Sequence, residues 1–449
     1  MADDDTELLR QNISEALDSD DQVGLAKLLT DSSVVEIANL LDSLPAQQRE
    51  AIWPQINPAE LGSVLLETGD ELRDARLNDL EATEIASIIE NLADVDDQAD
   101  LILSLSNDKL VNILLTLNSE NRERLEAVLS YADDTAGGLM NIDQITIRAD
   151  VSLDVVLRYL RIRGEMPNHT DQLFVTDREF HYLGALFLRD LLTNGPDEEV
   201  RSIMHTDIDA MNAHMSDAEV AREFEDYDLI SAPVIDEEHK LIGRITIDDV
   251  VDVIRDEGDH SIMNMAGLSE EEDMFSPLLI SSKRRGVWLG INLLTAFLAA
   301  YVIGFFEVIL EQIVALAILI TIVPSMGGIA GSQSLTLTIR GLALGQLGSS
   351  NFSALIKKEV LVGLINGLIW ALVVASFSII WFGDFRLGAI IGFALLVTLV
   401  TGAFAGAIIP VVLRKLGVDP AIAGGVILTT VTDVVGIIAF LGMATLVMG

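Results

Sequence analysis

The chain lacks cysteine entirely, and only 5% of its 449 residues are aromatic. Without thiols it has no disulfides and no thiolate metal ligands. Histidine is also scarce, and His260 is the last of the 6 in the chain. The carboxy-terminal half therefore lacks both the soft and the imidazole ligands that favour later transition metals.

Basic residues are few as well: 28 Lys and Arg stand against 69 Asp and Glu, a net charge of −41. Residues 1–285 hold 63 of the acids and 22 of the basic residues, whereas residues 286–449 hold 6 of each. The sequence thus joins an acidic soluble half to a neutral apolar half. The acidity fits a general adaptation to salt or a store of carboxylates for a cation, and composition leaves both open.

The apolar half contains five runs long enough to cross a bilayer: 286–310, 313–340, 359–383, 387–413 and 422–448. Dense basic clusters at 283–285, 340–358 and 414–415 all fall on the same side of these runs. The positive-inside rule then predicts a multi-pass protein of the plasma (inner) membrane, with a cytoplasmic amino-terminal half and the carboxyl terminus on the far side. The start, MADDDTELLR, predicts no signal peptide.

Residues 1–137 are predicted to form an all-α solenoid, because short apolar runs recur at helical spacing: VVEIANLLDSL, ELGSVLLETG, EIASIIENL, DLILSLS and KLVNILLTL. Between two of these runs lies ADVDDQADL, where Asp96 and Asp100 share a helix face. The plain alternative for these acids is a solvated, charge-complementary helix start.

From residue 138 the pattern becomes two units of about 60 residues, each reading helix, strand, turn, strand, helix. The turns VTDREFHYLG and VIDEEHKLIG match in length and in their Asp and Gly positions, which predicts a tandem α/β repeat. This pair resembles tandem CBS domains, which commonly bind adenosine compounds or, in some transporters, metal ions. Thr246, Asp248 and Asp249 occupy a stretch that often contacts ribose, although helix N-caps favour the same residues.

One acidic residue, Asp433 in ILTTVTDVVGIIAF, falls near mid-membrane. An ionised carboxylate there costs at least ~2.5–3.5 kcal/mol and usually faces a wet cavity or a partner. A bound cation is the expected counter-charge; the alternative is a protonated Asp bonded to a neighbouring helix. Thr429, Thr430 and Gly436 share its helix face and are predicted to line the same path.

The stretch IVPSMGGIAGSQS at 322–334 is unusual for a membrane helix. A proline removes a backbone donor, and freed carbonyls survive at membrane depth only where protein or water satisfies them. This favours a pore wall over helix packing alone, whereas packing is preferred for Gly402 and Gly406 in the fourth run. The predicted wall residues are Pro324, Gly327, Gly328, Gly331 and Gln333.

Four segments resemble signature segments of the MgtE family of magnesium transporters: PSMGGIAGSQSLTLTIRGLALG, VDPAIAGGVILTTVTDVVG, YADDTAGGLM and YDLISAPVIDEEHKLIGRITIDDVVDVI. The resemblance covers almost the whole chain in the family's domain order. It implies a solenoid (1–137), two CBS repeats (138–200 and 201–262), a connecting plug helix (263–285) and a pore domain of five helices (286–449).

The resemblance further implies a homodimeric Mg²⁺ channel, neither an enzyme nor a nucleic-acid binder, whose cytoplasmic domains sense Mg²⁺ and close the pore. Two copies of Asp433 across the dimer axis would supply the one or two carboxylates that Mg²⁺ usually takes. ATP or another adenosine nucleotide is a further candidate ligand at the CBS pair. The expected sensor residues are Asp96, Asp97, Asp100, Asp248, Asp249, Asp252, Asp256 and Glu257.

The sequence departs from the family where Ile329 and Ser332 replace two Asn, and where acids are lost at His260 and Ser261. Two other interpretations therefore stay open. One is a transporter or exchanger for another divalent ion such as Co²⁺, and the other is a membrane-anchored CBS nucleotide sensor.

Overall fold

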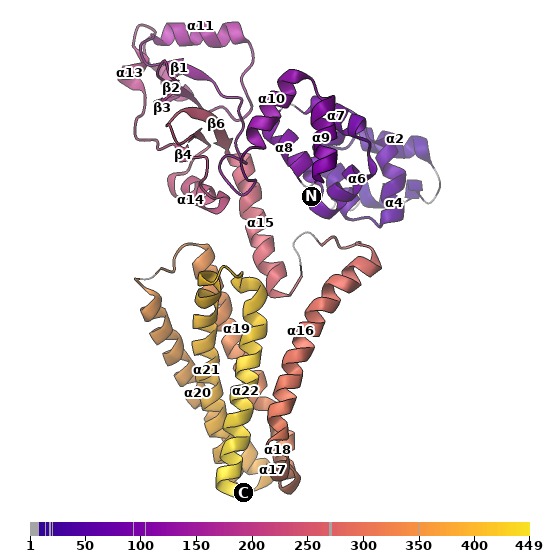
Figure 1. Cartoon of the computed structure of the whole chain (residues 1–449), viewed down its shortest axis with the longest axis vertical. Coiled ribbons are helices and arrows are strands. Elements are labelled where there is room, and N and C mark those ends of the chain that lie inside the picture. The colour runs from indigo at the N-terminus through magenta and orange to yellow at the C-terminus, as the bar shows by residue number, and fades with distance from the viewer. Residues whose placement is uncertain are drawn as a thin grey trace. The chain divides into compact units, whose positions relative to one another are not determined.

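The computed structural model separates into two compact units (Figure 1). The soluble unit runs to Gly258 and includes residues 272–277; the membrane unit comprises residues 259–268 and everything from Leu278 onward. The structure describes residues 9–13, 15–17, 19, 21–92, 94–103, 105–268, 272–348 and 350–449.

The predicted solenoid is a series of short helices that share one core. Capping residues set their limits: Ser33 and Glu36, for example, form a reciprocal capping box at the start of α3. Leu41, Leu65 and Ile89, each from a different helix, are fully buried in that common core. The helices are α2 (Gln22–Thr30), α3 (Val34–Asp42), α4 (Ala46–Ile52), η1 (Trp53–Gln55), α5 (Leu61–Glu67), α6 (Asp70–Asp79), α7 (Ala82–Asn91), α8 (Val95–Leu103), α9 (Asn107–Thr116) and α10 (Ser119–Val128).

The predicted tandem repeat is confirmed by two three-stranded sheets with the same order and the same pairing. In each sheet the first strand is parallel to the second and the second antiparallel to the third. The turns also correspond, because Phe180 and His239 both adopt positive φ at the same place. The elements are β1 (Thr146–Arg148), α11 (Leu153–Arg163), β2 (Gln172–Thr176), β3 (Tyr182–Phe187), α12 (Leu188–Thr193), α13 (Val200–Ile203), β4 (Met211–Asn212), α14 (Asp217–Tyr227), β5 (Ser231–Ile235), β6 (Leu241–Thr246) and α15 (Ile247–Met265).

The predicted connecting helix at 263–285 is wrong in its limits. The second repeat continues without a break into α15, which ends at Met265, and the next helix starts only at Leu278. Gly267 adopts a left-handed φ of 74°, a conformation that ends helices and favours glycine. Pro277 directly precedes the following helix, where a missing N–H is tolerated.

The five predicted spans are confirmed as five helical stretches long and apolar enough to cross a membrane. The second stretch is interrupted at Ile320 and Thr321, ahead of Pro324 in the first turn of α19, and the first predicted run, 286–310, is broken between Gly304 and Glu307. Since Pro324 has no N–H, it cannot bond the Ile320 carbonyl, and α18 ends there. The helices are α16 (Leu278–Gly304), α17 (Glu307–Gln312), α18 (Val314–Leu319), α19 (Ile322–Ala343), α20 (Phe352–Phe382), α21 (Phe385–Lys415) and α22 (Pro420–Met448).

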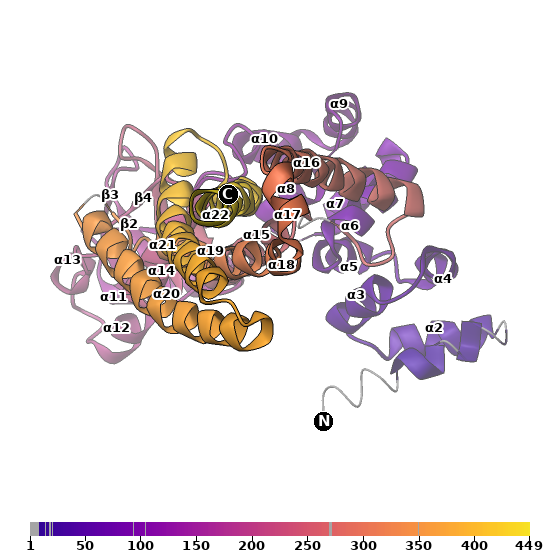
Figure 2. The same cartoon turned by 90° about the horizontal axis from the view of Figure 1, so that it is seen from below.

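Helix α21 is the centre of the membrane unit; Figure 2 shows it between α20 on one side and α19 and α22 on the other. Glycines make this close packing possible. A methyl group on Gly402 would lie 2.6 Å from the Gly327 carbonyl oxygen of α19, and one on Gly406 would collide with the Gly331 carbonyl oxygen. The packing role expected for Gly402 and Gly406 is therefore confirmed.

Gly402→Ala should lower the thermal stability of the full-length protein, because its methyl group meets backbone that cannot move aside. Overpacking of this kind costs typically ~1–3 kcal/mol. The melting temperature in detergent measures the effect. Gly290→Ala on α16 is the matched control, since nothing lies within 4 Å of that position. An equal melting temperature for the two variants would contradict the packing argument.

Candidate functional site

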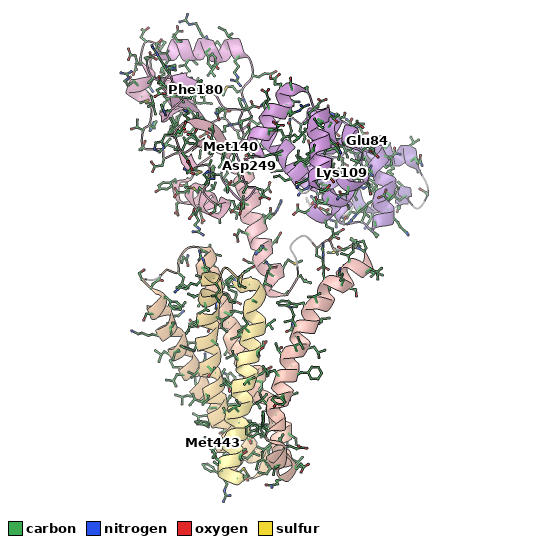
Figure 3. All side chains as sticks on the ribbon, viewed as in Figure 1. Glu84, Lys109, Met140, Phe180, Asp249 and Met443 are labelled. Atoms are coloured by element: carbon green, nitrogen blue, oxygen red, sulfur yellow. The ribbon has the colours of Figure 1, made fainter. Side chains whose placement is uncertain are left out.

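The acids predicted as a sensor gather at two helix starts within the soluble unit. Asp96 and Asp97 lie in the first turn of α8, and Asp248 and Asp249 in the first turn of α15. Thr246, the last residue of β6, fixes the second pair: its backbone N–H donates to Asp249 Oδ2 at 3.4 Å and its hydroxyl donates to the same oxygen at 3.2 Å. Figure 3 labels Asp249 at this start of α15.

Two residues that the sequence analysis did not select hold the cluster together. Buried Asn141 donates from Nδ2 to Asp94 Oδ1 at 3.1 Å and to Asp96 Oδ1 at 3.0 Å. Asn141 also exchanges backbone hydrogen bonds with Arg244 of β6, which ties the end of the solenoid to the second sheet. The motif YADDTAGGLM, which directly precedes Asn141, was the available signal in the sequence.

The carboxylates raise one another's pKa values. Burial is the largest cause at Asp96, which is 6% exposed, and the charges of Asp249, Asp97 and Asp94 add to it, so the pKa lies well above 3.8. Burial with neighbouring carboxylates likewise raises the pKa of Asp97 to about 6 and that of Asp249 to about 8.

Asp100 belongs to the same group but is more exposed. Desolvation and the charge of Asp97 raise its pKa to about 7. Because its side chain still reaches water, screening weakens its interactions with the neighbouring charges relative to those of Asp96. Asp252 adds further negative charge near Asp97 and Asp100.

Positive charge near the cluster is limited. The buried Arg244 guanidinium is close enough to be influenced by Asp94, Asp96, Asp248 and Asp249, but its nitrogens donate elsewhere, to Asp143 O, Asn168 O and Thr170 Oγ1. His169 Nδ1 lies 2.9 Å from Asp248 Oδ2. The donor set is thus rich in carboxylate oxygens, the ligands that hard divalent cations prefer.

The remaining predicted sensor acids lie farther along α15. Asp256 Oδ1 is 3.4 Å from Arg255 Nε, and burial, with a smaller contribution from the Asp70 carboxylate, raises the pKa of Asp256. Glu257 is exposed on the same helix. The Thr246 hydroxyl donates to Asp248 and Asp249 in its own turn, which is the helix-cap arrangement. Ribose binding by Thr246 and Asp249 stays a prediction.

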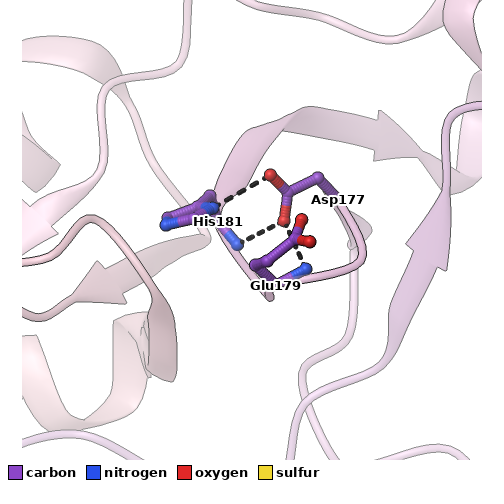
Figure 4. A group of neighbouring side chains, drawn as sticks. All are labelled: Asp177, Glu179 and His181. Carbon is purple, nitrogen blue, oxygen red and sulfur yellow. Dashed lines mark hydrogen bonds and ion pairs between the residues drawn. The ribbon is translucent and has the colours of Figure 1, made fainter.

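A second acidic group, Asp177, Glu179 and His181, has its ligand atoms within 4.8 Å of one another (Figure 4). Asp177 accepts the backbone N–H groups of both other residues and lies 2.9 Å from His181 Nδ1. The matching turn of the second repeat has Asp236, Glu238 and Lys240, with the same backbone bonds to Asp236. The second turn keeps these backbone bonds although Lys240 stands in place of the imidazole, so the bonds serve the turn itself. We therefore do not assign a metal to Asp177, Glu179 and His181.

In the membrane unit, Asp433 lies 13 residues from the start of α22 and 15 from its end, near the middle of the helix. Its side chain is half-buried, and within the described residues it makes no hydrogen bond or ion pair. Thr430, one turn before it, donates to the Val426 carbonyl at 2.7 Å, and Thr429 donates to the Gly425 and Val426 carbonyls. Their hydroxyl oxygens remain available as acceptors.

The predicted pore-wall glycines separate into two groups. Gly327 packs against Thr398 and Thr432, Gly331 against Leu428, and Gly436 against Thr398 and Val323, so these three serve helix packing within the protomer. Nothing lies within 4 Å of a methyl group placed on Gly328.

The open face of α19 is polar over much of its length. Gln333 is exposed there, and Ile329, at a position where the family commonly has Asn, is 56% exposed. The exposed residues of this helix as far as Arg340 are Ser325, Ile329, Ser332, Gln333, Thr336, Leu337 and Arg340.

Two polar contacts of the membrane unit were missed from the sequence. Glu359 of α20 is only 5% exposed, and its Oε2 accepts a 2.7 Å hydrogen bond from Ser334 of α19. His260 Nε2 lies 2.9 Å from Asp419 Oδ2, and Asp419 caps α22 by accepting the Ala421 N–H. Glu359 falls near the end of an apolar run, which hid its burial; the pairing of His260 depends on tertiary contact.

Three known families match successive parts of the chain. Residues 32–134 match the MgtE intracellular N domain, residues 200–256 the CBS domain, and residues 320–443 a family described as divalent cation transporters. Together with the five apolar helices, these matches define a multi-pass membrane protein of the divalent cation transporter class.

The relatives identify the family. The magnesium transporter MgtE of Enterococcus faecalis is 32% identical over 330 residues, covering 74% of this chain and 73% of the relative. The magnesium transporter MgtE of Thermus thermophilus is 30% identical over 448 residues, covering 98% of this chain and 99% of the relative. The chain belongs to the MgtE family, as the sequence motifs predict.

A solved structure is also similar to the soluble unit. The cytosolic domain of the Mg²⁺ channel MgtE in complex with ATP is 29% identical, with a TM-score of 0.49. It covers 54% of this chain, and 99% of that domain is matched.

Asp249→Asn should stabilise the metal-free full-length protein at pH 8. The folded-state pKa is raised to about 8 from 3.8, so the folded state binds the proton more tightly and stability falls as pH rises between these values. Asn keeps an acceptor for Thr246 but carries no charge. We expect a gain of roughly 1–2 kcal/mol at pH 8 that shrinks toward pH 4. Thermal melts with chelator measure it, with Glu225→Gln on the exposed side of α14 as control; a pH-independent difference would contradict it.

Proposed function

We propose that this chain is a Mg²⁺ channel or transporter of the plasma (inner) membrane whose soluble unit senses Mg²⁺ and closes the pathway when the ion is bound. Two carboxylate sites carry the proposal, because at each site the protein supplies too little positive charge to balance the carboxylates. One is Asp433 at mid-helix, and the other is the cluster between α8 and α15.

The transport path is proposed to run along the exposed faces of α19 and α22. Leaving Asp433 unpaired in hydrocarbon is costly, and such residues usually face a water-filled cavity or a partner. The polar face of α19, with Ser325 and Gln333, would be equally unfavourable against lipid. A second copy that covers both faces removes both costs, which supports a homodimer with the path at the junction of the two protomers.

Mg²⁺ suits such a path because it sheds its water reluctantly. The ion usually keeps several waters and takes one or two carboxylates directly. Two Asp433 side chains, one from each protomer, supply that number, and the acceptor oxygens of Thr429 and Thr430 lie one turn away to bind the ion's waters. The names of the family relatives, magnesium transporters, agree with this choice.

Gating is proposed to follow from the cluster. Without a cation, Asp96, Asp97, Asp248 and Asp249 repel, which favours separation of α8 from α15. A bound Mg²⁺ removes this cost and stabilises the assembled arrangement, so internal Mg²⁺ shifts the protein toward the closed state. The raised pKa values of Asp96 and Asp249 support this account, because burial and, after it, the neighbouring carboxylates both disfavour the charged forms.

The proposed orientation places the soluble unit in the cytoplasm and the carboxyl terminus on the far side, in agreement with the basic clusters and with the intracellular N domain family that residues 32–134 match. Nucleotide binding at the CBS pair stays a prediction. A different transported ion, such as Co²⁺, is favoured only by the replacement of a family Asn by Ile329.

Asp433→Asn should abolish Mg²⁺ uptake by proteoliposomes or lower it at least ~100-fold, since the path loses both charges that stand in for water around the ion. Asp384→Asn is the matched control, because Asp384 caps α21 outside the apolar core of the helix and Asn caps equally well. Uptake at the wild-type rate in Asp433→Asn would refute the path. The same assay with Co²⁺ decides between the ions.

The double variant Asp96→Asn with Asp249→Asn removes two of the repelling charges together with two proposed ligands of the cation, so Mg²⁺ flux should depend less on internal Mg²⁺. We expect the change in flux between low and high internal Mg²⁺ to shrink at least ~10-fold, a coupling of ordinary allosteric size. Glu179→Gln, in the acidic turn without an assigned metal, should behave as wild type. Limited proteolysis of the full chain adds a second measure: Mg²⁺ should protect the wild type but not the double variant.

A further inference from the structure

A buried arginine of the solenoid holds the segment that leads into the first membrane helix. Arg49 of α4 is 4% exposed, and its guanidinium forms a two-pronged contact with Asp273: Nη1 to Oδ2 at 2.5 Å and Nη2 to Oδ1 at 3.1 Å. Its remaining donors bond Leu41 O at 2.7 Å and Asp42 O at 3.2 Å. The guanidinium is thus fixed by the solenoid backbone before it meets Asp273.

A second residue of the solenoid, this one acidic, binds the same segment from a neighbouring helix. Glu71, in the first turn of α6, accepts the Asp273 backbone N–H at 3.0 Å and the Ser276 hydroxyl at 2.6 Å on Oε2. The ring of Phe275 lies 5.8 Å from the Arg49 guanidinium carbon, within the range of a cation–π contact. Residues 272–277 therefore belong to the soluble unit, although they follow α15 in the chain.

The hydrogen bonds between Arg49 and Asp273 are stronger than neutral hydrogen bonds. A planar guanidinium matches a carboxylate through two parallel hydrogen bonds, and charged hydrogen bonds are about twice as strong as neutral ones. Because Arg49 is buried, losing Asp273 would remove the carboxylate that its guanidinium hydrogen-bonds and leave the nearby Asp42 carboxylate to compensate its charge. Met274, by contrast, points away and is 88% exposed, so the segment is held by particular side chains rather than by general burial.

We propose that residues 272–277 are a tether through which the solenoid acts directly on α16. Pro277 ends the segment and α16 starts at the next residue, so the chain passes from the tether to the first membrane helix with no slack. The solenoid would then reach the membrane unit by two routes, one through the acid cluster and α15 and the other through the tether.

The tether also bears on cation sensing, and this part rests on the proposed gating. In one and the same conformation, α8 and α15 bring their acids together and Arg49 holds Asp273. Interactions present together in one state stabilise each other by linkage. Breaking the tether should therefore make the assembled state harder to reach and raise the Mg²⁺ concentration needed for closure.

The test uses the full-length protein in nanodiscs and three variants. Asp273→Asn removes the charge, Asp273→Glu retains it, and Met274→Ala changes an exposed neighbour. Hydrogen exchange of the amides of residues 272–277 reports the tether without reference to transport. We expect exchange about 10-fold faster in Asp273→Asn, a smaller increase in Asp273→Glu and none in Met274→Ala.

Flux assays on the same variants then report the coupling. Half-inhibition by internal Mg²⁺ should move ~3–10-fold higher in Asp273→Asn and stay unchanged in Met274→Ala. Fast exchange of the segment in the wild type overturns the tether itself, whatever the flux. A protected segment with unaltered half-inhibition in Asp273→Asn overturns its role in sensing. If Mg²⁺ does not inhibit the wild-type flux, the proposed gating is wrong and so is the role of the tether in sensing. The existence of the tether is then decided by hydrogen exchange alone.

Discussion

Uncompensated carboxylate charge in poorly solvated surroundings is the constraint on which the rest of this structure depends. In the soluble unit it raises the pKa of Asp97 to about 6 and of Asp249 to about 8. In the membrane unit it leaves Asp433 without a partner among the described residues. In the proposed function, a hydrated divalent cation resolves both situations, because it supplies charge and brings its own water. The same ion would then be the transported ion at one site and the regulator at the other.

Ordinary folding devices put these charges in place. The Thr246 cap aligns the first turn of α15, and Asn141 holds Asp94 and Asp96 from the opposite side. In the membrane unit, glycines bring α19, α21 and α22 together and leave the other face of α19 exposed. Each site thus depends on caps, hydrogen bonds and helix contacts that also stabilise the fold. The acids at these positions supply the negative charge on which the proposed function rests.

Much of the architecture could be predicted from the sequence, because it follows from periodicity and repetition. The five apolar runs, the solenoid and the tandem repeat are long-range patterns that tertiary contacts do not alter. The limits of the connecting helix could not be predicted in this way, since α15 extends the second repeat without a change of pattern and ends at Met265, two residues before Gly267. The roles of Gly327 and Gly331 also required the structure, because packing and pore lining demand the same small residue. Arg49 and Asp273 are 224 residues apart in sequence, and no local signal joins them.

The glycine contacts of α21 restrict how the membrane unit can change shape. Gly402 and Gly406 lie against the backbone of α19, so α19 cannot slide along α21 without a clash that side-chain rotation cannot relieve. Helix α22 also packs against α19, with the side chains of Leu428 and Thr432 against Gly331 and Gly327. A movement that tilts α19 and α21 together keeps the backbone contacts of Gly402 and Gly406, whereas a sliding movement between the two helices breaks them.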